Sequence, residues 1–160
     1  MIIDFSVFSN VKFPANEAIS TGVGIESRGV ETFFRDRARF DVTLRELNED
    51  YPHDPSACLG FMLPAAFAFF LPLFMKISIV DFDDADVISD TVVYRLRDMG
   101  MGKAEDNLRS IMHSYTHAQM QVVLDFLSEM SEIEWKFHNP DVALIAHGCL
   151  RDKFKLKDRM

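Results

Sequence analysis

Apolar residues recur at helical spacing along most of this chain. The clearest case follows Thr116, whose hydroxyl can cap a helix running to about residue 137. Polar residues such as Gln121, Asp125 and Glu132 fall on its other face. The apolar face holds Met120, Val123, Leu124, Leu127 and Met130. The spacing therefore predicts an amphipathic helix with one buried side.

The segment 57–75 carries no charged residue and could be either a membrane span or a buried helix. A span needs about 20 apolar residues, but Pro64 and Pro72 divide this run and both flanks are acidic. A helix over 64–79 that is apolar on every side is typical of a helix surrounded by others. Because proline lacks an amide N–H, Pro72 leaves the Ala68 carbonyl without its helical donor, and we expect a kink there.

The remaining pattern predicts shorter elements around this helix. Residues 2–13 alternate loosely and fit a strand or an extended arm, whereas the glycines in 20–29 indicate a loop. Helical spacing covers 30–49, with an interruption possible at 41–43. Asp81 or Asp83 can cap the following helix. Further helices are expected over 103–114 and, opened by Pro140, to about residue 149.

These elements predict an all-α, single-domain helical bundle around the buried helix 64–79. Within residues 1–160 we assign an N-terminal arm and loop to 1–29, a helical core to 30–150 and a basic tail to 151–160. That tail has five basic and two acidic residues and is expected to fray as a terminus. With 48% hydrophobic residues, including 15 Phe and 9 Met, the chain has ample material for one core.

Charge and cysteine content narrow the classes of partner and compartment. A net charge of −8 argues against nucleic acid and anionic membranes as partners, and it permits a basic protein. Cys58 and Cys149 form no Cys-x-x-Cys pair, and the N-terminus lacks the basic start of a signal peptide. We expect a cytoplasmic protein. Phosphate-loop, dinucleotide and nucleophile-elbow motifs do not occur, so no cofactor and no catalytic residue is assigned.

The densest group of ionisable residues is Asp81, Asp83, Asp84 and Asp86. An EF-hand reading fails, because no glycine stands at the sixth position and Val92 replaces the final Glu. Carboxylates in a first helical turn are accounted for by capping and by the helix dipole. They are also the strongest candidates for binding a basic partner, together with two acidic residues of the amphipathic helix, Glu129 and Glu132.

The histidines offer a weaker alternative. His113 and His117 have a zinc-like spacing of four, but the expected cap at Thr116 stands between them. His53, His138 and His147 lie near prolines or in apolar stretches, where hydrogen-bonded structural roles are expected. No metal site is assigned on these grounds.

Two stretches resemble an uncharacterised family of small bacterial helical proteins. The first is 61–75, an aromatic helix with Phe70, Leu71 and Pro72 in sequence; the second is 115–127, with Thr116, Gln119 and a Phe-Leu end. The resemblance spans roughly residues 30–130 and implies the fold, since the family has no established activity. Small size and acidity favour a non-catalytic protein-binding module, such as an immunity protein that neutralises a bacterial toxin. An enzyme of unrecognised type, metal-dependent through the aspartates or histidines, is the alternative.

Overall fold

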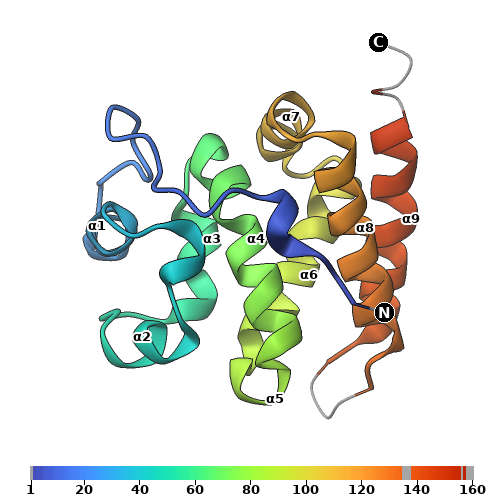
Figure 1. Ribbon diagram of the computed structural model, residues 1–160, viewed down its shortest axis with the longest axis horizontal. Helices are drawn as coiled ribbons and strands as arrows, with labels where there is room; N and C mark the ends of the chain where they lie inside the picture. The colour runs from blue at the N-terminus through green and yellow to red at the C-terminus, as the bar shows by residue number, and fades with distance from the viewer. Residues whose placement is uncertain (1, 135–137, 156, 158–160) are drawn as a thin grey trace.

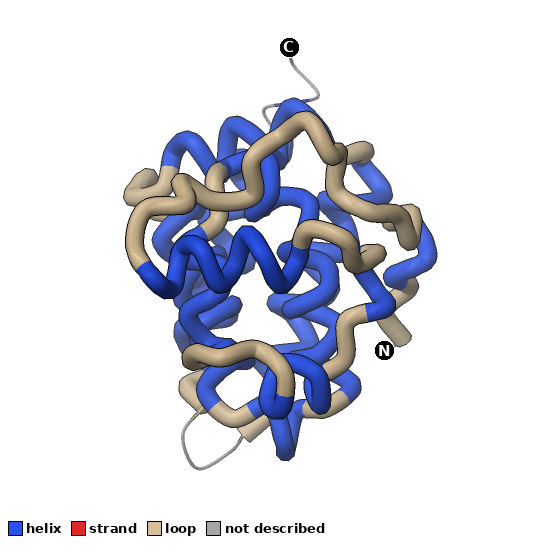
Figure 2. The backbone as a smooth tube through the Cα atoms, turned by 90° about the vertical axis from the view of Figure 1, so that its left-hand side faces the viewer, coloured by secondary structure: helices blue, strands red, loops and turns tan. Residues whose placement is uncertain are grey.

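A computed structural model describes residues 2–134, 138–155 and 157, and this part of the chain folds into helices and loops without a strand (Figures 1 and 2). The all-α fold class is therefore confirmed. The α-helices are α1 (Ile25–Phe34), α2 (Leu44–Glu49), α3 (Cys58–Phe61), α4 (Pro64–Val80), α5 (Phe82–Ala85), α6 (Val87–Gly100), α7 (Glu105–Ser114), α8 (His117–Glu132) and α9 (Pro140–Lys155). Three short 3-10 helices are η1 (Phe5–Val7), η2 (Arg39–Asp41) and η3 (Pro55–Ala57).

Helix α4 lies at the centre of the molecule, with α1 and α2 on one side and α8 and α9 on the other (Figure 1). The helix begins at Pro64. Proline costs no helical hydrogen bond at this position, because amides of the first turn have no acceptor within the helix. Helix α4 packs against α6 and α7, and its Phe70 and Phe74 rings contact Phe34 of α1 at centroid distances of 4.9 and 6.1 Å. The predicted central helix is confirmed, ending one residue later than expected. Within the described residues, no helix combines the length and apolarity needed to cross a membrane.

The Ala68 carbonyl has no helical donor because of Pro72, and it accepts a hydrogen bond from a side chain instead. The Tyr115 hydroxyl donates to the Ala68 carbonyl over 2.6 Å, and both groups are buried. A buried carbonyl left unpaired would cost about 1–3 kcal/mol, so this bond compensates for the proline inside the helix. The same bond fixes the segment between α7 and α8 against the middle of α4.

Residues 2–13 form an extended arm, interrupted only by the short turn of η1. Of the two predicted alternatives, a strand or an extended arm, the structure has the second. The arm crosses over α4 from the α8 side to the α1 side (Figure 1). Lys12 and Ala38 form an isolated antiparallel bridge, and the Arg39 amide donates to the Val11 carbonyl over 3.0 Å. The Gln119 side-chain amide holds the other end, donating to the Val7 carbonyl over 3.0 Å.

Two predictions for residues 20–49 need correction. The loop assigned to 20–29 ends early, because α1 already begins at Ile25. Gly29 lies inside this helix because a Cβ there would stand 2.8 Å from Cδ2 of His53. The helix expected over 30–49 breaks from Arg35 to Thr43, a longer interruption than residues 41–43. The broken stretch pairs with the arm instead of continuing the helix.

Of the predicted helix caps, the one for α8 is confirmed and the one for the helix after α4 is wrong. Thr116 caps α8 in a full capping box, with its hydroxyl accepting from the Gln119 amide and the Gln119 side chain accepting from the Thr116 amide. Asp81 and Asp83 were expected to cap the helix after α4, but neither does so. A separate short helix, α5, intervenes, and α6 starts after Asp86, whose side chain also makes no cap. The predicted inner positions Ala85, Ile88, Val92 and Leu96 are all buried.

The C-terminal helix is longer than predicted. Helix α9 runs to Lys155, past the predicted end near residue 149, and packs against both α6 and α8. Phe154 is buried and Lys157 donates to the Tyr115 carbonyl, so this part of the predicted frayed tail is docked on the core. Helix α8 ends at Glu132; residues 135–137 of its predicted range, and residues 156 and 158–160 of the tail, lie outside the described part of the chain.

Candidate functional site

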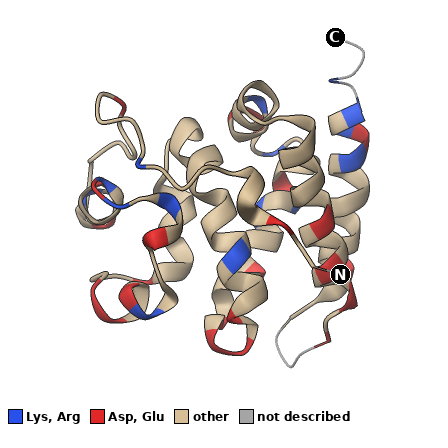
Figure 3. Ribbon diagram, in the orientation of Figure 1, with Lys and Arg blue, Asp and Glu red and all other residues tan. Residues whose placement is uncertain are grey.

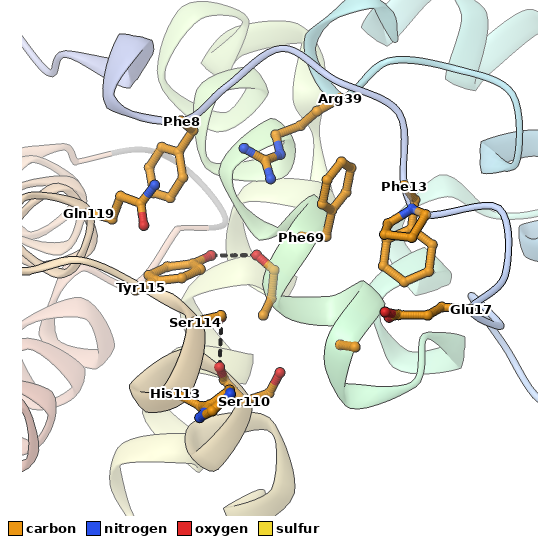
Figure 4. A pocket seen from close by; sticks show the side chains of 13 residues that line it. Phe8, Phe13, Glu17, Arg39, Phe69, Ser110, His113, Ser114, Tyr115 and Gln119 are labelled. Atoms are coloured by element: carbon orange, nitrogen blue, oxygen red, sulfur yellow. Dashed lines mark hydrogen bonds between the residues drawn. The ribbon is translucent and has the colours of Figure 1, made fainter.

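A cavity of about 360 Å³ lies between the N-terminal arm, α4 and α7 (Figure 4). The arm supplies Phe8 and Phe13 as one wall, and Phe69 of α4 adds another ring. Phe13 and Phe69 meet edge to face with centroids 5.3 Å apart. Most of the polar lining comes from α7 and the start of α8, and Ala65 and Ala68 of α4 add small apolar side chains. A mostly apolar cavity with a few converging polar groups has the usual character of a small-ligand site.

Arg39 of η2 brings a buried positive charge to this cavity. Only 8% of the residue is exposed. Its guanidinium lies over the Phe69 ring at 4.0 Å and near the Phe8 ring at 5.6 Å. Of its five N–H donors, Nη1 donates to the Ser9 carbonyl over 3.1 Å, while Nε is buried with no acceptor. No carboxylate in the described part of the chain forms an ion pair with it.

The protein compensates this charge only in part. A cation–π contact contributes about 0.5–2 kcal/mol, whereas removing a guanidinium from water costs several kcal/mol. Burial accordingly lowers the pKa of Arg39, since the charged form loses hydration. An arginine nevertheless stays protonated at any physiological pH. The cavity thus carries a fixed cation that no carboxylate of the described residues pairs with, although Glu17 also lines the cavity.

Tyr115 and residues of α7 supply further polar groups to the cavity. Burial raises the pKa of Tyr115, so its hydroxyl stays protonated and donates to Ala68 as described. The Ser114 hydroxyl donates to the Ser110 carbonyl over 2.7 Å, the second dashed bond in Figure 4. His113, at the last turn of α7, is exposed at the edge of the cavity. These groups offer hydrogen bonds to a ligand beside Arg39.

The residues predicted to bind a partner lie elsewhere. Asp81, Asp83, Asp84 and Asp86 form an acidic corner between α4 and α6, at the bottom of Figure 3. Asp83, Asp84 and Asp86 are exposed, and none of the four side chains makes a hydrogen bond or ion pair with another described residue. Asp86 also has a φ of +51° and a ψ of −128°, a strained conformation for a residue with a Cβ.

Glu129 and Glu132 belong to the last turns of α8 and are not part of the acidic corner itself. His138, which follows α8, links the two regions. It is buried, its Nδ1 lies 2.9 Å from Oδ1 of Asp90 and its Nε2 lies 2.9 Å from the Met130 carbonyl, while its ring meets Phe82 of α5 edge to face. The structural role predicted for His138 is confirmed.

The zinc-like pair is split between two helices, with His113 in the last turn of α7 and His117 opening α8. Within the residues that the structure describes, no three His, Cys, Asp or Glu side chains gather as a metal ion would require. Cys58 and Cys149 are free thiols, and burial raises the pKa of Cys58 to about 12.

Sequence reasoning missed Arg39, Tyr115 and the arm residues around them. Arg39 stands in a run with Arg35 and Arg37, which reads as a solvated helical face. One signal was available: Pro72 leaves a carbonyl in need of a donor. The sequence does not say that the donor is a tyrosine 47 positions from Ala68.

Comparison with known proteins yields one match. No curated protein and no solved structure matches this chain. A family of unknown function (DUF6714) matches it over residues 8–144, which includes the arm from Phe8 onward, α4, α7 and the whole lining of the cavity. The expected membership in an uncharacterised family is confirmed, and the chain belongs to this family of unknown function.

Proposed function

We propose that the protein binds a small organic anion, with its negative group at Arg39 and its apolar part against the phenylalanine rings of the cavity. The observation that carries the proposal is the buried guanidinium, with which no carboxylate of the described residues pairs. A carboxylate is planar and accepts two parallel N–H bonds from a guanidinium, so it satisfies the donors that the protein leaves over.

The walls favour an anion attached to an apolar body. Phe8, Phe13 and Phe69 supply ring faces and edges, and the Ala65 and Ala68 side chains are too small to fill the space between them. The cavity volume of about 360 Å³ falls within the usual range of small-ligand sites, which is about 300–1,000 Å³. Inorganic phosphate alone would leave this apolar surface uncovered.

Isothermal titration calorimetry with phenylpropionate tests the proposal. We expect saturable binding to the wild-type protein, and loss of at least tenfold in affinity in Arg39→Met, since one charge-assisted bidentate contact is worth about 1.5–3 kcal/mol. Arg39→Lys keeps the charge but not the planar fork and should bind with intermediate affinity. Arg45→Met is the matched control, because Arg45 is exposed on α2 and forms an ion pair with the exposed Glu49.

Thermal unfolding of the free proteins completes the test. Arg39→Met removes an uncompensated buried charge. The free energy of unfolding of the ligand-free variant should therefore equal or exceed that of the wild type, to within about 1 kcal/mol. Equal binding by wild type and Arg39→Met, or no binding of phenylpropionate or other arylalkyl carboxylates to the wild type, would refute the proposal. If Arg39→Met unfolds, Arg39 is needed for folding. The affinity of Arg39→Lys for phenylpropionate would then test the proposal in its place.

A second candidate function is the binding of a basic protein at the acidic corner, most concretely a toxin neutralised by an immunity protein. Its support is that Asp81, Asp83, Asp84 and Asp86 serve neither as caps nor in internal ion pairs among the described residues. The strained Asp86 adds to it, since a glycine at that position would relieve the strain.

Charge-matched variants test this second function. Asn at all four positions of the acidic corner should abolish retention of a basic protein from the lysate of the source organism. Neutralising four other exposed carboxylates, Glu26, Asp36, Glu49 and Asp50, changes net charge equally and should leave retention unchanged. Equal losses in both variants would mean nonspecific charge attraction, and no retained basic protein would contradict the function.

A further inference from the structure

A groove of about 410 Å³ lies between α8 and α9 and shares no lining residue with the Arg39 cavity. Its lining comes from the first half of α8 and the second half of α9. Helix α9 stands at one edge of the molecule (Figure 1). The groove is also separate from the acidic corner, so neither of the functions proposed above makes use of it.

The ionisable side chains of this groove are basic. Arg151 and Lys155 line it from α9, and each helix adds an imidazole, His117 from α8 and His147 from α9. No described Asp or Glu lines it, although acidic residues outnumber Lys and Arg by 25 to 17 in the chain. Arg151 forms an ion pair with the adjacent Asp152 at an Nε–Oδ1 distance of 3.6 Å, which is weak because both side chains are exposed. The positive charge of the groove therefore remains available to carboxylates of another molecule.

An apolar surface accompanies these charges along α9. One face of the helix, marked by spacings of four, three and four, holds Leu144, Gly148, Arg151 and Lys155. Leu144 is 61% exposed, and a Cβ at Gly148 would meet no atom within 4 Å, so the described chain leaves this face uncovered. The floor of the groove adds apolar carbon from three largely buried side chains, Met120, Leu124 and Phe154. The face is thus apolar toward the start of α9 and basic toward its end.

We propose that this groove binds an amphipathic helical segment of a partner protein, in which apolar residues stand beside glutamates or aspartates. Its carboxylates meet Arg151 and Lys155, and its apolar side chains lie against Leu144 and the groove floor. A helix suits a site that runs along α9, because residues three and four apart on a helix lie on one side of it. A small anion would use the basic end alone and leave Leu144 uncovered. Nucleic acid would meet the repulsion of a net charge of −8.

Fluorescence anisotropy with three dye-labelled peptides tests the proposal. Each peptide is an alanine-based helix with leucines on one face, and the positions beside the leucines are glutamate in the first, glutamine in the second and lysine in the third. We expect saturable binding of the glutamate peptide to the wild type. The glutamine peptide should bind roughly tenfold more weakly, the effect of two exposed ion pairs, and the lysine peptide should not bind measurably.

Variants of the groove separate its charged and apolar parts. Arg151→Gln combined with Lys155→Gln should weaken the glutamate peptide roughly tenfold and leave the glutamine peptide unchanged. Leu144→Ser should weaken both peptides by the same factor, because it removes an apolar contact that they share. Arg28→Gln combined with Lys103→Gln is the matched control, since both residues are exposed, lie outside the groove and change the net charge equally.

Three results would overturn the proposal: no saturable binding of the glutamate peptide to the wild type, equal losses in the groove pair and the control pair, or an oligonucleotide that binds through Arg151 and Lys155 as tightly as the peptide. The second result would mean long-range charge attraction, and the third a nonspecific site for polyanions. All the substituted positions are exposed, so circular dichroism of each variant should match the wild type. If a variant unfolds, the order of the three peptides on the wild type decides.

Discussion

At the residue scale, Glu31 fastens the segment before α1 to the helix itself. Its Oε2 accepts from the amides of Ile19 and Ser20 over 2.8 and 2.9 Å, and its Oε1 accepts from the Arg35 guanidinium. Partial burial opposes ionisation, but the hydrogen bonds from Arg35 and from the two amides outweigh it and lower the pKa of Glu31. One carboxylate thus holds the segment that leads from the arm into α1.

We expect Glu31→Gln to lower the free energy of unfolding by about 1–2 kcal/mol at pH 7, because charge-assisted bonds become neutral ones. Since the folded-state pKa lies below the unfolded value of about 4.3, the stabilisation is complete above that pH and is lost as pH falls through the folded-state pKa. Urea unfolding at about pH 7 and pH 3 should show the difference shrinking in acid. Glu49→Gln, which removes only an exposed ion pair, should change stability little at either pH.

The bond between Tyr115 and Ala68 predicts a coupling with Pro72. Tyr115→Phe leaves the buried Ala68 carbonyl without a donor and should cost about 1–3 kcal/mol. In a Pro72→Ala background the new amide at position 72 can donate to that carbonyl, so the same tyrosine substitution should cost less. Guanidinium unfolding of the four proteins of this cycle measures the difference. Equal costs in both backgrounds would mean that the hydroxyl acts independently of the proline.

At the scale of elements, α6 and α9 approach each other closely through a glycine. A Cβ at Gly100 would lie 2.8 Å from Cβ of Cys149 and 3.4 Å from Cγ of Leu150. We therefore expect Gly100→Ala to destabilise the protein by about 1–3 kcal/mol, since the two helices must separate. Gly148→Ala, inside α9, meets no atom within 4 Å and should stabilise by about 0.5–1 kcal/mol. Thermal unfolding followed by circular dichroism checks both; shifts of the same sign would contradict the packing argument.

Elements that depend on local signals were predictable from sequence. The central helix follows from its strongly apolar sequence with Pro64 at its first position, and α8 follows from Thr116 and its apolar face. Where a contact from elsewhere decides, sequence reasoning failed. The break after Phe34 depends on the arm, the glycine in α1 on His53, and the extension of α9 on burial of Phe154.

The cavity was unpredictable for the same physical reason. Its lining comes from the arm, η2, α4, α7 and α8, so no continuous motif marks it. Arg39 is separated from Glu17 and from Tyr115 by elements whose packing brings all three to one place. The acidic corner is the opposite case. Its residues lie within six positions of the sequence, so the sequence alone identifies the group, although the predicted capping role is wrong.

At the scale of the whole molecule, acidic and basic residues are mixed on α1 and α2, whereas one acidic and one basic group lie at different ends (Figure 3). The acidic corner lies at the bottom of Figure 3, and the basic side chains of Arg151, Lys153 and Lys155 lie at the C-terminal end of α9 near the top. Basic residues in a last helical turn stabilise the negative end of the helix dipole. The C-terminal charges therefore have a local explanation and are no evidence for nucleic-acid binding.

The arm that covers the cavity also sets the time scale on which a ligand can enter and leave. A few hydrogen bonds hold the arm, among them the one from the Arg39 amide to the Val11 carbonyl. The Phe67 amide, by contrast, donates within the central helix, to the Leu63 carbonyl. The arm can lift while the bundle stays intact. The amide of Arg39 should therefore exchange its hydrogen faster than the amide of Phe67. A bound ligand should slow exchange at Arg39 and leave the relative exchange rates of the α4 amides unchanged. Residence time would then be governed mainly by the lifting of residues 2–13.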